Sequence, residues 1–106
     1  MLTFYPCVRD LTFAIPNGGS RNIIEAKNLK AQGVTAGVPD IFMAMPRGDY
    51  HGLFIEMKSK GGRLSDYQKK WLLNLNNNGY LALPCYSVDE AMDTASRYLG
   101  RNLINV

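Results

Sequence analysis

Apolar residues along the chain fall into short strand-like blocks, separated by stretches with helical spacing. The blocks are rich in Val, Ile, Leu and Phe and are bounded by Pro, Gly or Ser. This pattern predicts four strands, over residues 11–15, 38–45, 53–58 and 81–86. A short polar loop joins the second and third strands, so these two are expected to form an antiparallel hairpin. Pro84 lacks a backbone donor and places the fourth strand at a sheet edge.

Helix signals occupy the intervals between the strands. Ser20 is a suitable N-cap for a helix over residues 21–32, and Gly33 is suitable to end it. Two segments have the spacing of a capping box, and each predicts the start of a helix. Ser65–Gln68 opens a helix over residues 66–76, and Ser87–Glu90 opens the last helix. The expected apolar face of the helix over 66–76 consists of Tyr67, Trp71, Leu72 and Leu75.

The order of predicted elements is strand, helix, strand, strand, helix, strand, helix. This order is typical of an α/β domain with a mixed β-sheet flanked by helices. The chain has 106 residues and is 46% hydrophobic, which suits one domain, residues 1–106, with a modest core.

Composition and motifs exclude several classes of protein. No apolar run approaches the roughly 20 residues of a membrane span, and residues 1–8 lack the regions of a signal peptide. We therefore expect a cytoplasmic protein with no membrane partner. Cys7 and Cys85 form no C-x-x-C motif and are expected to be buried thiols. His51 is the only histidine, which excludes sites built on two histidines of one chain.

The charge distribution is more informative than the net charge. The net charge is +3, from 12 basic and 9 acidic residues, which alone is weak evidence for a polyanionic partner. Residues 56–70 contain five basic and two acidic side chains, a local surplus of +3. This basic segment is either a solvated loop or a contact surface for a polyanion.

Two carboxylates and an ammonium group stand beside apolar strand formers, at Asp40, Glu56 and Lys58. Alternate side chains of a strand share a face, so Glu56 and Lys58 are neighbours roughly 6–7 Å apart. In the predicted hairpin, Asp40 falls opposite Met57 or Glu56 according to the register. Either register brings its carboxylate near that of Glu56, although the register decides which face Asp40 uses.

Such a group of residues predicts a metal-dependent phosphodiesterase. Two close carboxylates repel unless one is protonated or a cation lies between them. Mg²⁺ and Mn²⁺ accept these ligands together with water and phosphate, and they activate both for hydrolysis. Lys58 could orient or deprotonate the water, or neutralise charge on the phosphate. The alternative is a simple ion pair between Glu56 and Lys58 on an exposed strand face, with Pro39-Asp40 as an ordinary turn.

With these residues the chain resembles the PD-(D/E)xK nuclease superfamily and, more narrowly, the VRR-Nuc family. The resemblance covers about residues 13–99. The bare PD…ExK pattern is weak, but a series of segments matches in a specific order. These segments are residues 15–19 with Arg21, then 29–34, 37–40, 50–58, 64–68 and 79–80.

The resemblance implies a restriction-endonuclease-like sheet and a Mg²⁺- or Mn²⁺-dependent DNA endonuclease. Asp40 and Glu56 would bind the metal together with the Met57 carbonyl, and Lys58 would be catalytic. Gln68 would line the site from its helix; it could instead cap that helix, or do both. Trp71 on the same helix fits the core better than a base-stacking platform.

The resemblance also implies partners. Small free-standing members of the family resemble phage or bacterial proteins that act as homodimers on branched DNA, including four-way (Holliday) junctions, and a chain of 106 residues fits that kind. No small-molecule cofactor is expected. Asn17 and Arg21 lie at a predicted helix start, which offers free amides to an anion. The expected contacts to DNA are Asn17, Arg21, Lys60, Arg63 and Lys69.

One part of the family pattern has no clear counterpart in the sequence. Family members usually have a helix before the Asn-Gly-Gly segment, often with an acidic residue near the site. The residues before Asn17 are expected to be extended, and neither Asp10 nor Glu25 clearly replaces that acid. Either the site works with Asp40 and Glu56 alone, or the sequence begins late.

Other functions stay open at this point. The nuclease could act on flaps, nicks or single strands. The basic segment could belong to a non-catalytic nucleic-acid-binding module, or the Trp71 helix could serve an oligomeric structural protein. Metal dependence separates a nuclease from a binder, because a pure binder keeps its affinity without metal and loses it only with salt.

Overall fold

Four strands form one mixed sheet in the order β1-β2-β3-β4 in the computed structural model, which describes residues 6–16 and 33–100. The strands are β1 Thr12–Ala14, β2 Ile41–Met43, β3 Leu53–Met57 and β4 Leu81–Cys85. β1, β2 and β3 are antiparallel neighbours, and β4 runs parallel to β3. The predicted turn at 17–19 and helix at 21–32 lie outside the described residues. The described part contains no helix that could cross a membrane.

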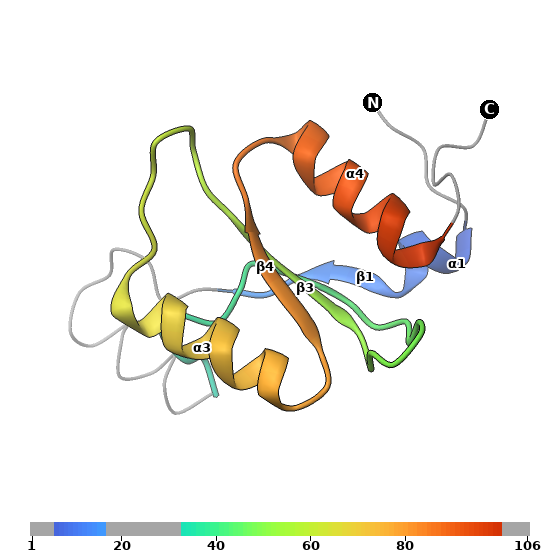
Figure 1. The fold of residues 1–106 in the computed structure, drawn as a ribbon, viewed down its shortest axis with the longest axis horizontal. Coiled ribbons are helices and arrows are strands. Elements are labelled where there is room, and N and C mark those ends of the chain that lie inside the picture. The colour runs from blue at the N-terminus through green and yellow to red at the C-terminus, as the bar shows by residue number, and fades with distance from the viewer. Residues whose placement is uncertain (1–5, 17–32, 101–106) are drawn as a thin grey trace.

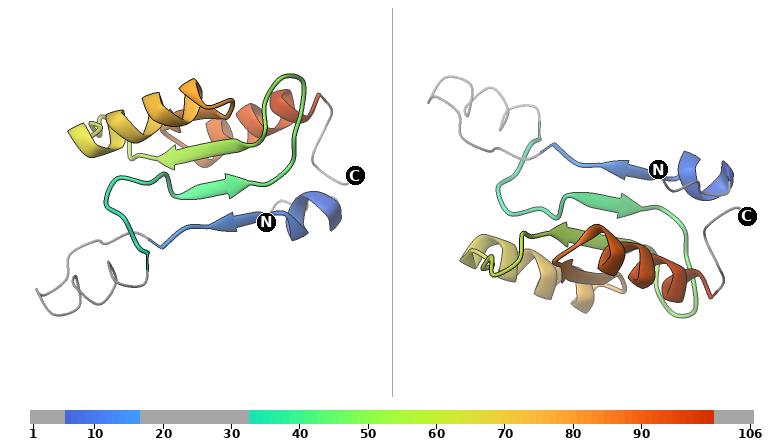
Figure 2. Two further views of the ribbon diagram at one scale, coloured as in Figure 1. Left: turned by 90° about the horizontal axis from the view of Figure 1, so that it is seen from below. Right: turned by 90° about the horizontal axis from the view of Figure 1, so that it is seen from above.

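Helices cover both faces of the sheet (Figures 1 and 2). α3, Asp66–Asn77, lies on one face over β4, and it forms the crossover that joins the parallel strands β3 and β4. α4, Val88–Leu99, lies on the other face, together with the short α1, Pro6–Asp10. The predicted α/β architecture, a mixed sheet flanked by helices, is confirmed.

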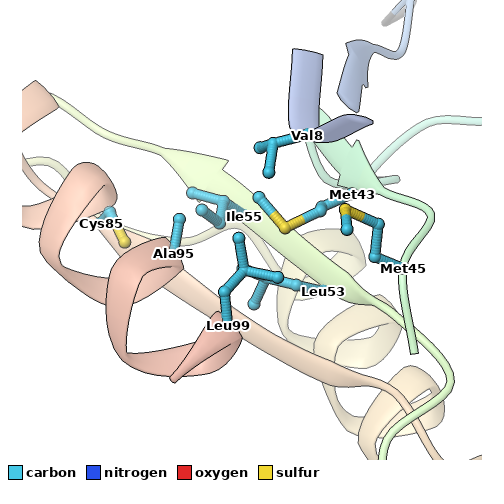
Figure 3. Packing of buried hydrophobic residues seen from close by; sticks show 8 residues of the cluster. All are labelled: Val8, Met43, Met45, Leu53, Ile55, Cys85, Ala95 and Leu99. Atoms are coloured by element: carbon cyan, nitrogen blue, oxygen red, sulfur yellow. The ribbon is translucent and has the colours of Figure 1, made fainter. Parts of the chain in front are cut away.

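The main core lies between the sheet and the α4 side (Figure 3). Its buried side chains come from α1, three strands, the β2–β3 connection and α4, and they are Val8, Met43, Met45, Leu53, Ile55, Cys85, Ala95 and Leu99. Because strand side chains alternate, Leu53 and Ile55 face this core, whereas Phe54 and Glu56 face the α3 side. β3 is therefore covered on both faces, and this places Glu56 in the interior.

Three predictions about local structure are wrong. The second strand is confined to Ile41–Met43, because Gly37 turns the chain and the buried Pro39 has no donor for a ladder. The residues before Asn17 are not all extended, since α1 forms there and the buried Val8 anchors it to the core. Tyr67 is 68% exposed rather than part of the buried face of α3.

The two capping boxes differ. At Ser65 the box is complete, because the Ser65 hydroxyl accepts from the Gln68 amide and the Gln68 side chain accepts from the Ser65 amide. At Ser87 only the hydroxyl bond from the Glu90 amide forms, and the Glu90 carboxylate instead accepts from the Tyr86 amide at 3.3 Å. Both boxes nevertheless start helices at the predicted positions.

β4 is an edge strand, as Pro84 predicted, and its outer edge is occupied by side chains. The Asn76 amide donates to the Ala82 carbonyl (2.8 Å) and accepts from the Ala82 amide (2.9 Å), as a neighbouring strand would. Pro84 has no amide proton, and the Tyr86 amide is bound by Glu90. A second strand therefore finds no continuous ladder to extend along β4.

Replacing Asn76 with alanine is expected to lower the free energy of unfolding by about 1–3 kcal/mol. The side chain bonds both backbone groups of Ala82 and also the Leu72 carbonyl, so its loss detaches α3 from the edge strand. Urea unfolding measures the effect. Asn77→Ala, an exposed neighbour on the same helix, is the control and should change stability by less than about 0.5 kcal/mol. Equal effects of the two substitutions would contradict this role of Asn76.

Candidate active site

The strand register decides where the Asp40 carboxylate lies. Ile41 pairs with Ile55 and Phe42 with Phe54, so continuing the ladder by one pair sets Asp40 opposite Glu56. Directly opposed residues of an antiparallel pair share a face, so both carboxylates lie on the α3 side of the sheet. Of the two registers that the sequence left open, this is the one that forms.

Asp40 is held in place by the backbone of both neighbouring strands. Its Oδ2 accepts a hydrogen bond from the Met57 amide at 2.8 Å, and its carbonyl accepts one from the Ile15 amide at 2.7 Å. β2 begins only at Ile41, so the Met57 amide has no strand carbonyl opposite it. The Asp40 side chain accepts the hydrogen bond of this amide instead. The carboxylate is therefore fixed at the end of the hairpin.

The chain leading to Asp40 passes against the first turn of α3. Gly37 has a φ of +87°, and a Cβ at this position would lie 2.7 Å from the carbonyl carbon and the Cβ of Tyr67. Only glycine permits both this backbone conformation and this approach. Gly37 belongs to one of the segments that resemble the family, but nothing in the local sequence links this glycine to Tyr67.

Glu56 is the buried acid of the site, with only 3% of its surface exposed. Its Oε1 accepts a hydrogen bond from Gln68 Nε2 at 2.6 Å. Its Oε2 is buried and has no hydrogen-bond partner within the described structure. A buried charged oxygen without a partner is unfavourable, so the fold leaves one acceptor atom of Glu56 unsatisfied at this point.

Burial, followed by the charge of Asp40 and a hydrogen bond that the protonated acid can donate to it, raises the pKa of Glu56 to about 7, although Lys58 opposes the shift. The site therefore favours a proton on Glu56 when no other cation is present. A divalent cation bound between the two carboxylates would remove this preference. The electrostatics are those of a site that lacks positive charge.

Gln68 performs both of the roles that the sequence suggested for it. Its Oε1 accepts from the Ser65 amide at 2.8 Å, which completes the cap of α3, and its Nε2 donates to Glu56. The cap bond fixes which end of the amide faces the carboxylate. The start of α3 and the orientation of Glu56 are thus determined by one side chain.

Lys58 follows Glu56 on the same side of β3 and is half-buried. Its amide donates to the Cys85 carbonyl at 2.8 Å, so the pairing with β4 continues to this residue beyond the strand proper. The strand alternation therefore extends to Lys58 and keeps it beside Glu56. The structure brings Asp40, Glu56, Lys58 and Gln68 together at the end of β3.

The other expected site residues are less closely tied to this centre. Lys60 and Arg63 are exposed on the connection that leaves the end of β3, and Lys69 is exposed on α3, which follows this connection (Figure 1). Asn17 and Arg21 lie outside the described residues. In the part of the chain that is described, one ion pair forms, between Arg97 and Asp93.

The structure provides no third acid from the residues it describes. Asp10 is exposed and lies near the end of β1 where Thr12 pairs with Met43. Asp40 lies at the opposite end of β1, where its carbonyl accepts from the Ile15 amide. Glu25 lies outside the described residues. Within residues 6–16 and 33–100, no group of three His, Cys, Asp or Glu side chains could hold a metal. The acidic ligands that the described residues offer to a metal at this point are therefore the two carboxylates of Asp40 and Glu56.

A mixed sheet with two carboxylates and a lysine at the end of a hairpin defines a nuclease-type α/β domain. The family profile described as "VRR-NUC domain" matches residues 7–89, so the chain belongs to the VRR-NUC domain family. A solved structure of a VRR_NUC domain protein is similar, with a TM-score of 0.75 and 29% identity over 88% of this chain and 70% of that one. No curated protein matches the chain. The family confirms the predicted nuclease-type domain, with DNA as its partner.

The raised pKa of Glu56 predicts a pH-dependent stability of the metal-free protein. A folded-state pKa near 7, against about 4.5 in the unfolded chain, stabilises the fold at low pH, and this stabilisation is lost as the pH rises through 7. In EDTA, the free energy of unfolding should fall by about 2 kcal/mol between pH 5 and pH 8 from this group. Urea unfolding at the two pH values measures the change.

Glu56→Gln is the matched control for this measurement. The amide mimics the protonated acid and cannot titrate, so the variant should lose this part of the pH dependence and be the more stable protein at pH 8. An identical pH dependence in both proteins would show that Glu56 does not have a raised pKa.

Proposed function

We propose that this domain is a metal-dependent endonuclease that hydrolyses phosphodiester bonds in DNA. The main support is the buried Oε2 of Glu56, which has no hydrogen-bond partner in the described structure. Asp40 lies directly opposite Glu56 on the neighbouring strand. A structural ion pair does not account for it, because Lys58 forms no bond to Glu56 that satisfies this oxygen. A bound cation accounts for both the burial and the second carboxylate.

The residues present fit Mg²⁺ or Mn²⁺. Both ions take hard oxygen ligands and retain several waters, so two carboxylates and a carbonyl are sufficient protein ligands. Asp40 and Glu56 would supply the carboxylates. The Met57 amide points toward Asp40, and the carbonyl of a strand residue points to the same side as its amide, which favours Met57 as the third ligand.

The metal would polarise the scissile phosphate and make a bound water more acidic. The protein groups then have separate tasks. Gln68 holds one oxygen of Glu56 and leaves the other oxygen free for the ion. Lys58 stands next to Glu56, where its ammonium group can orient the attacking water or neutralise charge that develops on the phosphate.

The proposed substrate is branched DNA such as a four-way junction, and the proposed assembly is a homodimer in the cytoplasm of the cell. The substrate and the dimer follow the family resemblance, whereas the location follows from the sequence, in which we expect neither a membrane span nor a signal peptide. The basic residues beside the site, Lys60, Arg63 and Lys69, are exposed and available to contact phosphates, and Asn17 and Arg21 are proposed to add to them. The occupied edge of β4 argues that the two copies associate through another surface.

A cleavage assay on a panel of DNA structures tests the proposal. Four-way junction, flap, nicked, single-stranded and plain duplex DNA are incubated with the protein in Mg²⁺, in Mn²⁺ and in EDTA. We expect cutting that requires either ion and that favours branched DNA over plain duplex. If the protein binds these DNAs without cutting any of them in either ion, it is a binding module and not a nuclease.

Replacing Lys58 with alanine is expected to lower kcat at least about 100-fold, because the charge next to the reacting phosphate is lost. Folding should be retained, since this half-buried side chain is not part of the core cluster. Arg9→Ala is the control for loss of a positive charge, because Arg9 is exposed on α1 at the opposite end of β1. Undiminished cutting by Lys58→Ala would remove Lys58 from the mechanism.

A further inference from the structure

Tyr67 is the most exposed large hydrophobic side chain in the described part of the chain, with 68% of its surface accessible. The sequence pattern assigned it to the buried face of α3, yet no ring contact or side-chain hydrogen bond is formed by it within the described residues. The side chain therefore contributes little to the stability of the fold. Its position, rather than its packing, suggests a role.

That position is the junction of the two segments that build the site. Tyr67 immediately precedes Gln68, whose side chain holds Glu56. The Cβ of Tyr67, from which the ring extends, lies against Gly37, three residues before Asp40. The tyrosine thus lies on the first turn of α3, between the contact with Gly37 and the residue that holds Glu56.

The charges around Tyr67 favour a polyanion as the occupant of this surface. Lys60, Arg63 and Lys69 are exposed, and none of them forms an ion pair in the described structure. A second copy placed on this surface by two-fold symmetry would bring like charges together, which is unfavourable. Unpaired cations with an exposed aromatic ring among them are the usual composition of a single-stranded nucleic-acid surface.

We propose that Tyr67 stacks on an unpaired nucleobase next to the scissile phosphate. In a continuous duplex both faces of each base are covered by its neighbours, so a surface ring can reach a base only where the strand is splayed or single. The residue therefore selects DNA with an unstacked nucleotide at the cutting position. This inference rests on the proposed function and names the local feature of the substrate that the site requires.

Binding in EDTA tests Tyr67 without any cleavage. A splayed duplex carries 2-aminopurine at the first unpaired position, and the fully paired duplex serves as the second ligand. Tyr67→Ala should weaken binding of the splayed DNA by about 10-fold or more and abolish the quenching of 2-aminopurine on binding. Its affinity for the paired duplex should stay within about two-fold of the wild-type value. Tyr67→Phe should retain both affinity and quenching, because it keeps the ring.

Leu73→Ala is the matched control. Leu73 is 60% exposed on the same helix but stands nearly two turns further along it, so its loss removes a comparable apolar surface away from the site. This variant should bind both DNAs as the wild type does. Thermal unfolding of all variants should show no loss of folding, since both side chains are largely exposed.

The outcomes separate this inference from the proposed function. If the wild type cuts DNA and Tyr67→Ala binds splayed DNA as tightly as the wild type, the stacking role is wrong and the nuclease proposal stands. Equal weakening for splayed and paired DNA, or loss of quenching in Tyr67→Phe, also overturns the stacking role. A wild-type protein that neither binds nor cuts any DNA overturns the proposed function together with it.

Discussion

A carboxylate buried beside a second carboxylate is the constraint on which the arrangement of this domain depends. Glu56 lies on β3, which is buried on both faces of the sheet, and Asp40 is fixed opposite it by the Met57 and Ile15 amides. Two neighbouring carboxylates of like charge destabilise the fold unless a proton or a cation compensates them. The protein therefore carries a local energetic cost at the proposed active site, and perturbed carboxylates of this kind are common at functional sites.

The rest of the structure supports this pair. The antiparallel hairpin sets the register, and the α4-side core holds the hairpin rigid through Leu53 and Ile55. α3 approaches from the other face and delivers Gln68, whose side chain both caps the helix and binds Glu56. Because one amide makes both bonds, the start of the helix cannot move without moving the carboxylate. Side chains held in this way by their own local structure give a preorganised site.

The β4 edge and the end of the sheet near the carboxylates indicate how the domain meets other molecules. Side chains occupy the ladder positions of β4, so this edge does not recruit another strand. The end of the sheet that carries the carboxylates is lined instead by exposed cations and by Tyr67. A polyanion with accessible bases fits that surface better than a strand or an apolar partner. The nuclease family of the chain is consistent with this distribution of charge.

The sequence by itself determined the order of elements from β2 to α4, the strand face shared by Glu56 and Lys58, and the starts of α3 and α4. These features depend on strand periodicity and on capping, which act between residues close in the chain. The capping role of Gln68 follows from its local spacing from Ser65. Its place at the site was implied only by the family resemblance, because the bond to Glu56 joins segments that are distant in sequence. Only the tertiary structure decided the register that sets Asp40 opposite Glu56, the contact of Gly37 with Tyr67 and the burial of Val8 that forms α1. Each of these depends on packing between segments far apart in sequence, and local propensity does not encode such packing.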